Sequence, residues 1–593
     1  LKQMPANIIK SIEVITSPGA KYDAEGSGGV INIITKKGLQ GLNGSVNASV
    51  GNYSLGTGTT LSYRKKKIGL SLSANMYRNR YINEAEFTRT TLKDGQPFNI
   101  TDQQSRQDNT GTGGYGELSF DYDPDSLSRI NFSANVWGGV FPNNGSMSTS
   151  VKDNQGNILQ KYSTVNRFKN PFGNGQLDLG YTKTFKKPGR EFSLLTQFSR
   201  MPDNYFYETE FYDVNDELYV TNLSDNYSRN KEYTVQSDYV HPFTIIGKKD
   251  TAEVKIETGA KLIYRDIGSE YFLSYLVDSS GEVVPDPMQT NVFDYTQKVI
   301  SGYTSISIDS RKKWGFVGGL RLERTELDGN FRSTATVVNN SFNNLIPSVT
   351  ISKGFKAHRV KISYTQRIQR PMIWLLNPWR NQNDPKNIWT GNPSLLPELN
   401  HAWEISHSVT GENAFSLNSA VFYRYTNKGF EFISEVDSTG VSTIRPQNIG
   451  KRYDLGTNIN VSVQPDKNWN LSGGLQLTYV DMKTITTSLK NSGWIWRVNY
   501  NTTYKLPKDF SIQANGDVGS GWISLQGKNS GWYWYGFSAK KELLVKKASL
   551  TFNVNNPFNR NISFHSQMSD PTFRQNFENR HVSRSVRLTL ATA

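Results

Sequence analysis

From about residue 41 to the C-terminus, apolar and polar residues alternate with a period of two, and this pattern limits what the chain can fold into. For example, Val254, Ile256 and Leu262 fall on one face of an extended segment, while Lys255 and Glu257 fall on the other. Successive side chains of a β-strand point to opposite sides of the sheet. The pattern therefore predicts many long strands, each with an apolar face and a polar face.

The composition narrows the classes of protein that such strands can build. Hydrophobic residues make up 36% of the 593 residues and aromatic residues 12%, and the mean hydropathy is −0.56. No run of 18 apolar residues exists, which argues against membrane-spanning helices, and the aromatic content argues against disorder. A transmembrane β-barrel fits both facts, because only every second residue of its strands meets lipid. A soluble all-β adhesin with several domains is the alternative, since its strands alternate too.

The lengths of the connections favour the barrel. Short turns alternate with connections of roughly 20–30 residues, as in outer-membrane barrels with short periplasmic turns and long extracellular loops. The long connections are expected at 81–110, 141–171, 202–229, 267–290, 370–399 and 557–580. About 22 strands are expected, at 41–51, 54–64, 67–80, 111–122, 128–140, 172–186, 190–201, 230–241, 251–266, 291–308, 313–329, 342–353, 358–369, 400–410, 414–427, 453–465, 469–483, 493–505, 509–518, 531–543, 547–556 and 581–591. A barrel of that width needs a plugged lumen.

The first residues belong to a different unit. A strand is expected at 11–16, and a second begins after the glycines of residues 26–29 and ends at a lysine pair. A helical turn is expected over residues 5–10, with a proline at its start. We therefore predict a small α/β unit over residues 1–38 and an all-β membrane barrel over residues 39–593.

Two stretches resemble a known family. Residues Ile12–Lys36, with the run Gly28-Gly29-Val30-Ile31-Asn32-Ile33-Ile34-Thr35-Lys36, resemble the end of the plug domain of TonB-dependent outer-membrane receptors. Residues 364–398, with Arg370-Pro371, Leu376-Asn377-Pro378 and Gly391-Asn392-Pro393, resemble a barrel loop of the same receptors, especially of the Bacteroidota type. With the strand spacing added, the resemblance covers nearly the whole chain.

The resemblance implies an integral protein of the bacterial outer membrane that imports a scarce ligand through a plugged barrel of 22 strands. Residues 1–37 would form the gate, with Gly26, Gly28, Gly29 and Asn32 at its centre, and the pairing of 11–16 with 29–36 would hold it. The inner-membrane TonB complex would supply energy through a TonB box in N-terminal sequence that we expect to be missing here. We also expect a few residues to be missing at the C-terminus, because the usual terminal aromatic residue is absent.

The net charge of +15 does not point to nucleic acid, because the basic residues are spread over short turns rather than one patch. The cluster Arg64–Lys67 and the lysines at 186–187, 312–313 and 546–547 are examples. We predict no nucleic-acid partner. Our hypothesis is that these turns lie on the periplasmic rim and meet anionic headgroups of the inner leaflet of the outer membrane; ordinary soluble turns are the alternative.

Enzymatic chemistry is not expected. The chain has no cysteine, its six histidines are dispersed, and no P-loop, HExxH or GxSxG arrangement appears. No cofactor is predicted. The one candidate for a metal site is calcium at Asp213, Asp216 and Glu217, because oxygen ligands at short spacing suit this ion; a solvated acidic loop is the other explanation.

The predicted ligand-binding residues lie in two long connections. The first set is Trp374, Trp379, Arg380, Asn383, Asp384 and Trp389, and the second is Trp522 and Trp532. Aromatic faces beside amide and guanidinium groups suit glycans, siderophores, peptides or cobalamin. Alternatively, these tryptophans only pack the loops or meet lipid.

A second function also remains open at this point. The barrel could be a scaffold subunit of an outer-membrane complex, with its plug permanently seated and no substrate. A surface lipoprotein or another outer-membrane protein would then be its partner.

Overall fold

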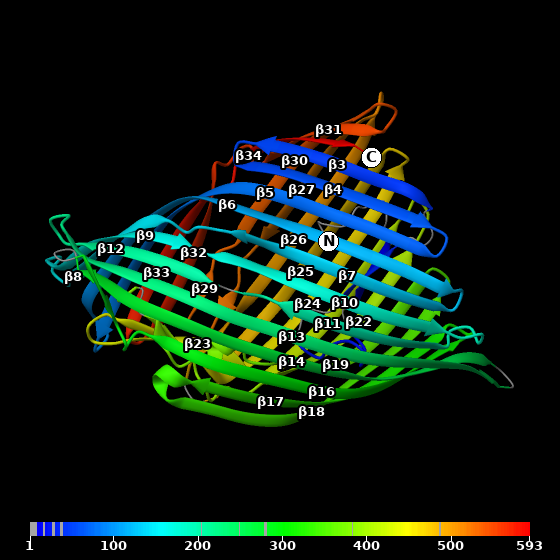
Figure 1. The fold of residues 1–593 in the computed structure, drawn as a ribbon, viewed down its shortest axis with the longest axis horizontal. Coiled ribbons are helices and arrows are strands. Elements are labelled where there is room, and N and C mark those ends of the chain that lie inside the picture. Colours follow the sequence, from blue (N-terminus) through cyan, green and yellow to red (C-terminus); the bar gives the residue numbers. More distant parts are fainter. Residues whose placement is uncertain are drawn as a thin grey trace.

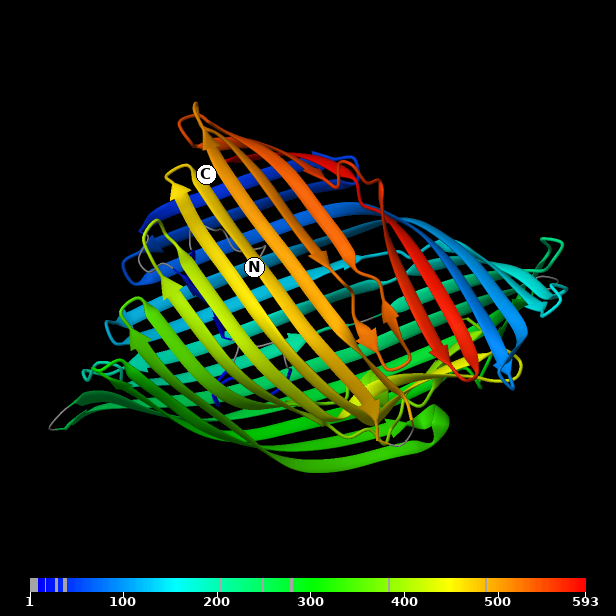
Figure 2. The same ribbon diagram turned by 180° about the vertical axis from the view of Figure 1, so that it is seen from behind.

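The structure of the chain is a computed structural model. It describes residues 9–15, 18–26, 30–35, 40–202, 204–247, 250–277, 281–381, 384–485 and 488–592. Tilted strands wrap around a wide lumen, and the chain follows the wall from one strand to the next (Figure 1). The same strands continue around the back of the molecule (Figure 2). Among the described residues, no helix is long and apolar enough to cross a bilayer.

The wall is a closed antiparallel barrel of 22 strands. The first strand pairs with the last, Val50 opposite Leu588, and this pairing closes the cylinder. The barrel strands are β3 (Gly41–Gly51), β4 (Ser54–Lys65), β5 (Ile68–Lys93), β6 (Gln96–Asp125), β7 (Ser128–Val140), β10 (Pro171–Thr184), β11 (Glu191–Arg200), β13 (Leu218–Ile246), β14 (Thr251–Val277), β16 (Asn291–Ser310), β17 (Trp314–Phe331), β18 (Thr336–Phe355), β19 (His358–Gln369), β22 (Glu398–Thr410), β23 (Ser416–Val436), β24 (Ser442–Asp466), β25 (Trp469–Thr484), β26 (Lys490–Leu506), β27 (Phe510–Gly519), β30 (Trp532–Leu543), β31 (Ala548–Asn555) and β34 (Ser585–Thr592). The 22 predicted strands are confirmed, with ends that differ mainly on one side of the barrel.

The long connections contain more strand than we expected. β5 has 26 residues and β6 has 30, so the connection at 81–110 is a paired hairpin that extends the wall. Shorter strands add to this extension, which we call the collar. They are β8 (Gly145–Asp153), β9 (Ile158–Lys169), β12 (Tyr205–Tyr212), β15 (Glu282–Pro285), β28 (Ile523–Ser524), β29 (Gly527–Asn529), β32 (Asn561–Asp570) and β33 (Phe573–Val582). Two further short strands, β20 (Arg380–Asn381) and β21 (Asn387–Thr390), belong to the connection at 370–399.

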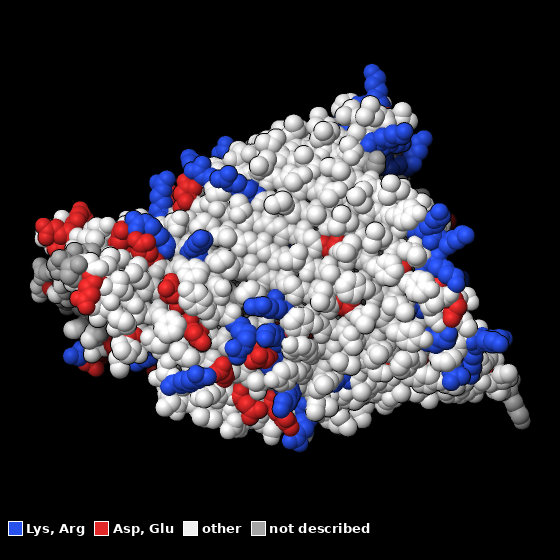
Figure 3. All heavy atoms as spheres, in the orientation of Figure 1, with Lys and Arg blue, Asp and Glu red and all other residues white. Residues whose placement is uncertain are grey.

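The charged residues mark where the bilayer lies. Lys, Arg, Asp and Glu gather towards the two ends of the barrel, and the band between them carries few charged side chains (Figure 3). Large apolar residues such as Leu179, Val421 and Phe552 are exposed on the outer face of the barrel. An apolar band between polar rims is the surface that an outer-membrane barrel presents to lipid.

The N-terminal residues are separate from the barrel sheet. β1 (Ile9–Ile15) pairs antiparallel with β2 (Val30–Thr35) in a sheet of two strands. The backbone pairing predicted for the two N-terminal strands is therefore present. The helical turn expected over residues 5–10 is wrong at Ile9 and Lys10, which belong to β1; residues 1–8 lie outside the described residues.

Candidate functional site

Residues 18–26 lie against the inner wall of the barrel. The amide of Gly26 donates to the carbonyl of Ile368 at 3.1 Å, and the amide of Ile368 donates to the carbonyl of Ala24 at 3.0 Å. Glu25 and Ile368 form an isolated parallel bridge. The segment is therefore attached to β19 as a short added strand.

Arg367 binds the backbone of this segment directly. It lies on β19 and donates to the carbonyls of Gly26, Asp23 and Glu25 at 2.7, 2.6 and 2.9 Å. Hydrogen bonds to a charged donor are stronger than bonds between neutral groups. Because one guanidinium binds three backbone carbonyls, it fixes the path of the segment independently of the side chains of residues 18–26.

Arg321 supports the segment from β17. Its neighbours Leu320 and Leu322 are exposed on the outer face, while Arg321 is 1% exposed and points inward. It donates to Ser301 Oγ at 2.7 Å and to the carbonyl of Ala20 at 3.4 Å. Arg321 thus connects residues 18–26 to two barrel strands.

A second arginine on the wall shares a carboxylate with Arg321. The Arg321 Nε lies 2.5 Å from Oε1 of Glu323, and Arg370 binds the other oxygen of the same carboxylate. Arg370 also lies 3.5 Å from the carboxylate of Glu25. Arg265 of β14 lies 3.7 Å from the same carboxylate. We call the arginines around residues 18–26 the clamp: Arg265, Arg321, Arg367 and Arg370.

Two lysine–carboxylate pairs complete the attachment. Lys261 of β14 lies 2.7 Å from the carboxylate of Asp23, and Lys21 lies 2.9 Å from Glu257 of the same strand. The segment is therefore held by charge–charge and charge–carbonyl contacts on β14, β17 and β19. Sequence reasoning missed these partners, although Arg367 and Arg370 lie within the second stretch of family resemblance.

The structure describes two of the four predicted gate residues, Gly26 and Asn32. Gly26 has φ +90°, a conformation that favours glycine, and its carbonyl is one of those bound by the clamp. Asn32 pairs with Glu13 through the backbone. Gly28 and Gly29 lie outside the described residues.

A charged cavity of about 380 Å³ lies beside the attached segment. Pro18 lines one side, and β22, β23 and β24 contribute the carboxylates of Glu398 and Glu431 and the guanidinium groups of Arg424 and Arg452. Such a mixture of fixed charges can hold a polar ligand or ordered water. The cavity marks a polar space between residues 18–26 and the wall.

The connection at 370–399 folds inward across the mouth of the barrel, and we call it the lid. It contains the one-turn helix α1 (Ile373–Leu376) and the strands β20 and β21. Its buried leucines pack in one cluster with apolar residues of the collar. The cluster consists of Leu375, Leu376 and Leu395 with Phe293, Tyr295, Leu327, Phe331 and Val338.

The far end of the lid is tied to β5 and β6, across the barrel from β19 and β22 in the order of the strands. Arg89 donates to the carbonyl of Lys386 at 3.1 Å and to Gln575 at 2.9 Å, and it also binds Asn387. Gln103 donates to Asp384 at 3.3 Å. The lid is thus anchored on both sides of the mouth.

Arg89 is the most buried of these anchors. It is 1% exposed, and burial lowers the pKa of its guanidinium to about 10. It lies 21 residues beyond the start of β5, past the roughly 9–11 residues that a strand needs to span the bilayer. Because the pKa stays well above 7, the group remains a cation at neutral pH.

The predicted ligand-binding residues do not form one site in the lid. Trp374 and Trp389 lie together on Phe432, with ring centroids 6.1 and 5.3 Å from it. Trp379 packs on Tyr271 at 4.7 Å. Arg380 is exposed and Asp384 is used in the anchor, and Asn383 lies outside the described residues.

The second predicted set lies in another connection. Trp522 is exposed, and Trp532 donates its indole N–H to Asp517 at 2.7 Å. Ligand binding by either set stays a prediction. The packing alternative fits Trp379 and Trp532, whereas Trp374 and Trp522 keep exposed faces that a ligand could reach.

The calcium candidate is part of a turn. The carboxylate of Asp213 accepts the amides of Asn215 and Glu217 at 2.8 and 2.9 Å, at the tip between β12 and β13. Within the described residues, no group of three or more His, Asp or Glu is placed to hold a metal ion. Calcium at Asp213, Asp216 and Glu217 stays a prediction that this geometry does not support.

Gly391 gives a first testable prediction about the lid. Its amide donates to Asn377 O at 2.9 Å, and an added Cβ would lie 2.4 Å from the same oxygen and 2.7 Å from Leu375 O. We expect Gly391→Ala to force these two backbones apart at a cost of roughly 1–3 kcal/mol, so that amide hydrogens of the lid exchange faster. Gly175→Ala is the matched control, because an added Cβ there meets nothing within 4 Å. Unchanged exchange in Gly391→Ala would show that the close approach does not hold the lid.

Comparison with known proteins identifies the barrel. Residues 183–591 match the model of the outer membrane protein beta-barrel family. No match was found among curated protein sequences.

Solved structures share the fold. The siderophore receptor PiuA from Acinetobacter baumannii is 14% identical over 99% of this chain and 86% of its own, with a TM-score of 0.65. The ferric yersiniabactin uptake receptor FyuA from Yersinia pestis is 12% identical over 99% and 85%, with a TM-score of 0.64. The copper transporter OprC is 12% identical over 96% and 85%, with a TM-score of 0.62. At this identity the likeness establishes the fold alone.

Proposed function

Because this chain belongs to the outer membrane protein beta-barrel family, we propose that it is an importer whose lumen is gated by residues 18–26. It is an integral protein of the outer membrane, and the fold it shares with outer-membrane receptors supports a role in transport. The observation that carries the proposal is the clamp, which attaches the segment to the wall through polar contacts. Residues 1–38 would be the last part of a plug, and residues 39–593 the barrel.

The chemistry of the clamp suits a gate that has to open. Water in the lumen can replace hydrogen bonds to Arg367, so the net loss for each bond to this charged group is limited to about 1.5–3 kcal/mol. If apolar packing held the segment instead, water could not replace its contacts when the segment leaves the wall. Fixed arginines also rebuild the same geometry when the segment returns. A force on the N-terminal side of the plug could therefore open a path past β14, β17 and β19.

We propose the TonB complex as the source of that force and metal chelates as the first ligands to test. Two of the matched structures are receptors for siderophores or ferric yersiniabactin, and a third is a copper transporter. Glycans, peptides and cobalamin remain further candidates. A ligand would meet the exposed faces of the lid first and then the charged cavity beside Pro18.

The proposal is tested by uptake in cells that express the full gene product. We expect radioactive iron, offered as ferric citrate or as hydroxamate or catecholate siderophore complexes, or copper, to accumulate in wild-type cells. Accumulation of at least one of these should be lost when either the receptor or TonB is removed. Uptake that persists without TonB would contradict energy coupling.

The scaffold alternative predicts the opposite set of results. The barrel would then co-purify in a fixed ratio with another outer-membrane protein or a surface lipoprotein, and every member of the panel would accumulate equally with and without the receptor. Equal accumulation without a fixed partner would instead reject the metal-chelate class and move the test to glycans and peptides.

A further inference from the structure

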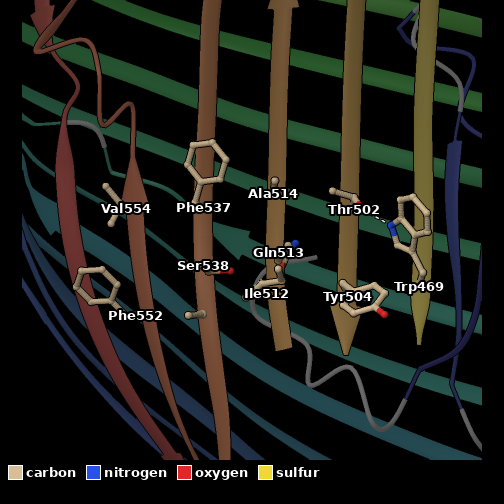
Figure 4. A pocket seen from close by; sticks show the side chains of 11 residues that line it. Trp469, Thr502, Tyr504, Ile512, Gln513, Ala514, Phe537, Ser538, Phe552 and Val554 are labelled. Atoms are coloured by element: carbon tan, nitrogen blue, oxygen red, sulfur yellow. Dashed lines mark hydrogen bonds between the residues drawn. The ribbon is translucent and has the colours of Figure 1, made fainter. Parts of the chain in front are cut away.

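A groove of about 660 Å³ lies on the outer face of the barrel wall. Its side chains come from β25, β26, β27, β30 and β31, and they stand side by side along neighbouring strands (Figure 4). The residues that shape it are Trp469, Tyr504, Ala514, Phe537, Ala539 and Phe552. The size is within the range of about 300–1,000 Å³ that is typical of sites for small molecules.

The groove follows from the sequence of outward-facing residues. Ala514 of β27 and Ala539 of β30 leave two shallow positions in the floor, because each carries only a methyl group. Phe537 lies opposite Ala514 and Ile512 lies opposite Ala539, and the strands on both sides carry aromatic rings. Further along β27, an added Cβ at Gly516 would lie 2.5 Å from the ring of Tyr500. This ring therefore lies over Gly516 and limits the groove at that end. The result is an elongated apolar channel rather than a flat wall.

The groove lies next to the short-turn rim, which faces the periplasm in barrels of this kind. Trp469 is the first residue of β25, and it pairs with Tyr504 near the end of β26. The indole N–H of Trp469 donates to Thr502 Oγ1 at 2.9 Å. Tryptophan and tyrosine rings are typical of the depth where acyl chains give way to headgroups. The groove thus lies in the periplasmic leaflet.

The rim beside the groove is basic. Residues 466–469, 505–509 and 540–547 carry seven lysines and three carboxylates. Lys541 binds the carbonyl of Lys508, and its Nζ lies 4.4 Å from the centroid of the Phe510 ring. Lys508 and Lys541 therefore both lie at the turn at 507–509 beside the groove, which also carries the carboxylate of Asp509.

We propose that this groove is a binding site for one anionic glycerophospholipid of the periplasmic leaflet. An acyl chain lies over Ala514 and Ala539 between the aromatic rings. The phosphate lies at the turn 507–509, where Lys508 and Lys541 attract it. The proposal goes beyond import, because it holds equally for a transporter and for a scaffold.

Two features favour a lipid over a protein in the groove. Exposed apolar residues such as Leu475, Phe510 and Leu550 surround the groove, on a wall where lipid is the solvent. The polar groups are at one end only, as in a phospholipid with a charged head and apolar chains. A strand or helix of a partner protein would instead contact the aromatic rings on both sides, because the floor between them is narrow.

The test measures which phospholipids stay bound after purification. The barrel is extracted in mild detergent with equal amounts of phosphatidylglycerol and phosphatidylethanolamine, and bound lipid is counted by native mass spectrometry. We expect about one phosphatidylglycerol per chain to be retained, at least fivefold above phosphatidylethanolamine. Retention of neither lipid, or of both equally, would overturn the proposal.

Two double variants test separately how the groove binds the acyl chains and how it selects the headgroup. Ala514→Phe with Ala539→Phe fills the floor and should reduce retention at least tenfold, while Ala134→Phe, at a lipid-facing position of β7, should leave it unchanged. Lys508→Asn with Lys541→Gln should remove the preference for phosphatidylglycerol but keep a bound lipid; asparagine is chosen at 508 because φ is +60° there. Circular dichroism confirms that each barrel is folded. If the lipid is still retained when the groove is filled, the occupant is not this lipid. The same conclusion follows if filling the groove releases a second protein that had co-purified with the barrel.

Discussion

Cysteine at positions 20 and 319 is expected to lock the gate segment to the wall and to abolish uptake under oxidising conditions. An added Cβ at Gly319 of β17 would lie 2.9 Å from the Cβ of Ala20. The two Cβ atoms of a disulfide are about 3.8 Å apart, so a shift of roughly 1 Å suffices. The chain has no cysteine of its own, and the periplasm favours disulfides. The introduced thiols therefore have only each other to pair with.

Uptake of the ligand identified by the panel measures the effect. We expect transport by Ala20→Cys/Gly319→Cys to fall at least tenfold without reductant and to recover when a thiol reductant is added. The two single variants are the controls, since each carries the substitution without the bond. If the disulfide forms, as judged by mass spectrometry, and uptake continues at the wild-type rate, residues 18–26 do not have to leave the wall and the gating proposal fails.

The membrane part of the barrel could be predicted because lipid imposes a strict pattern. Strands such as 128–140 and 358–369 have an outward face that must be apolar, and their short turns leave little freedom in register. The collar lacks this constraint. Residues 99–110 carry asparagine, glutamine, serine and aspartate on both faces, so the alternation disappears although the backbone pairing continues through Asn99 and Thr91. For this reason connections that we expected as loops are paired strands.

The clamp could not be found from the sequence for a different reason. Arg321 and Ala20 are 301 positions apart, and only closure of the barrel brings them together. An isolated arginine on a polar face looks like any other luminal charge. The tryptophans and the Gly391-Asn392-Pro393 run single out the lid in the sequence. Its anchoring across the mouth depends on Arg89, which no local pattern singles out.

Replacing Arg89 by glutamine is expected to free the far end of the lid while the membrane barrel stays intact. The substitution removes a buried cation and its hydrogen bonds to the carbonyls of Lys386 and Gly440, while the carbonyl of Lys386 keeps the amide of Ser442 as a donor at 3.0 Å. A hydrogen bond to a charged group contributes about 1.5–3 kcal/mol. The loss falls on the contacts between the lid and the collar, because the pairing of barrel strands does not involve this side chain.

Limited proteolysis of the protein in its membrane measures this release. Lys386 is a trypsin site inside the lid, and in the intact structure it is half-buried beside Arg89. We expect cleavage after Lys386 to be at least tenfold faster in Arg89→Gln, with an unchanged melting temperature of the barrel. Arg106→Gln is the matched control, because Arg106 lies on the same collar with an exposed side chain 3.6 Å from Glu84, and such surface pairs contribute only about 0–1 kcal/mol. Equal cleavage of wild type and Arg89→Gln would mean that the leucine cluster and the pairing of β21 with β24 hold the lid across the mouth without Arg89.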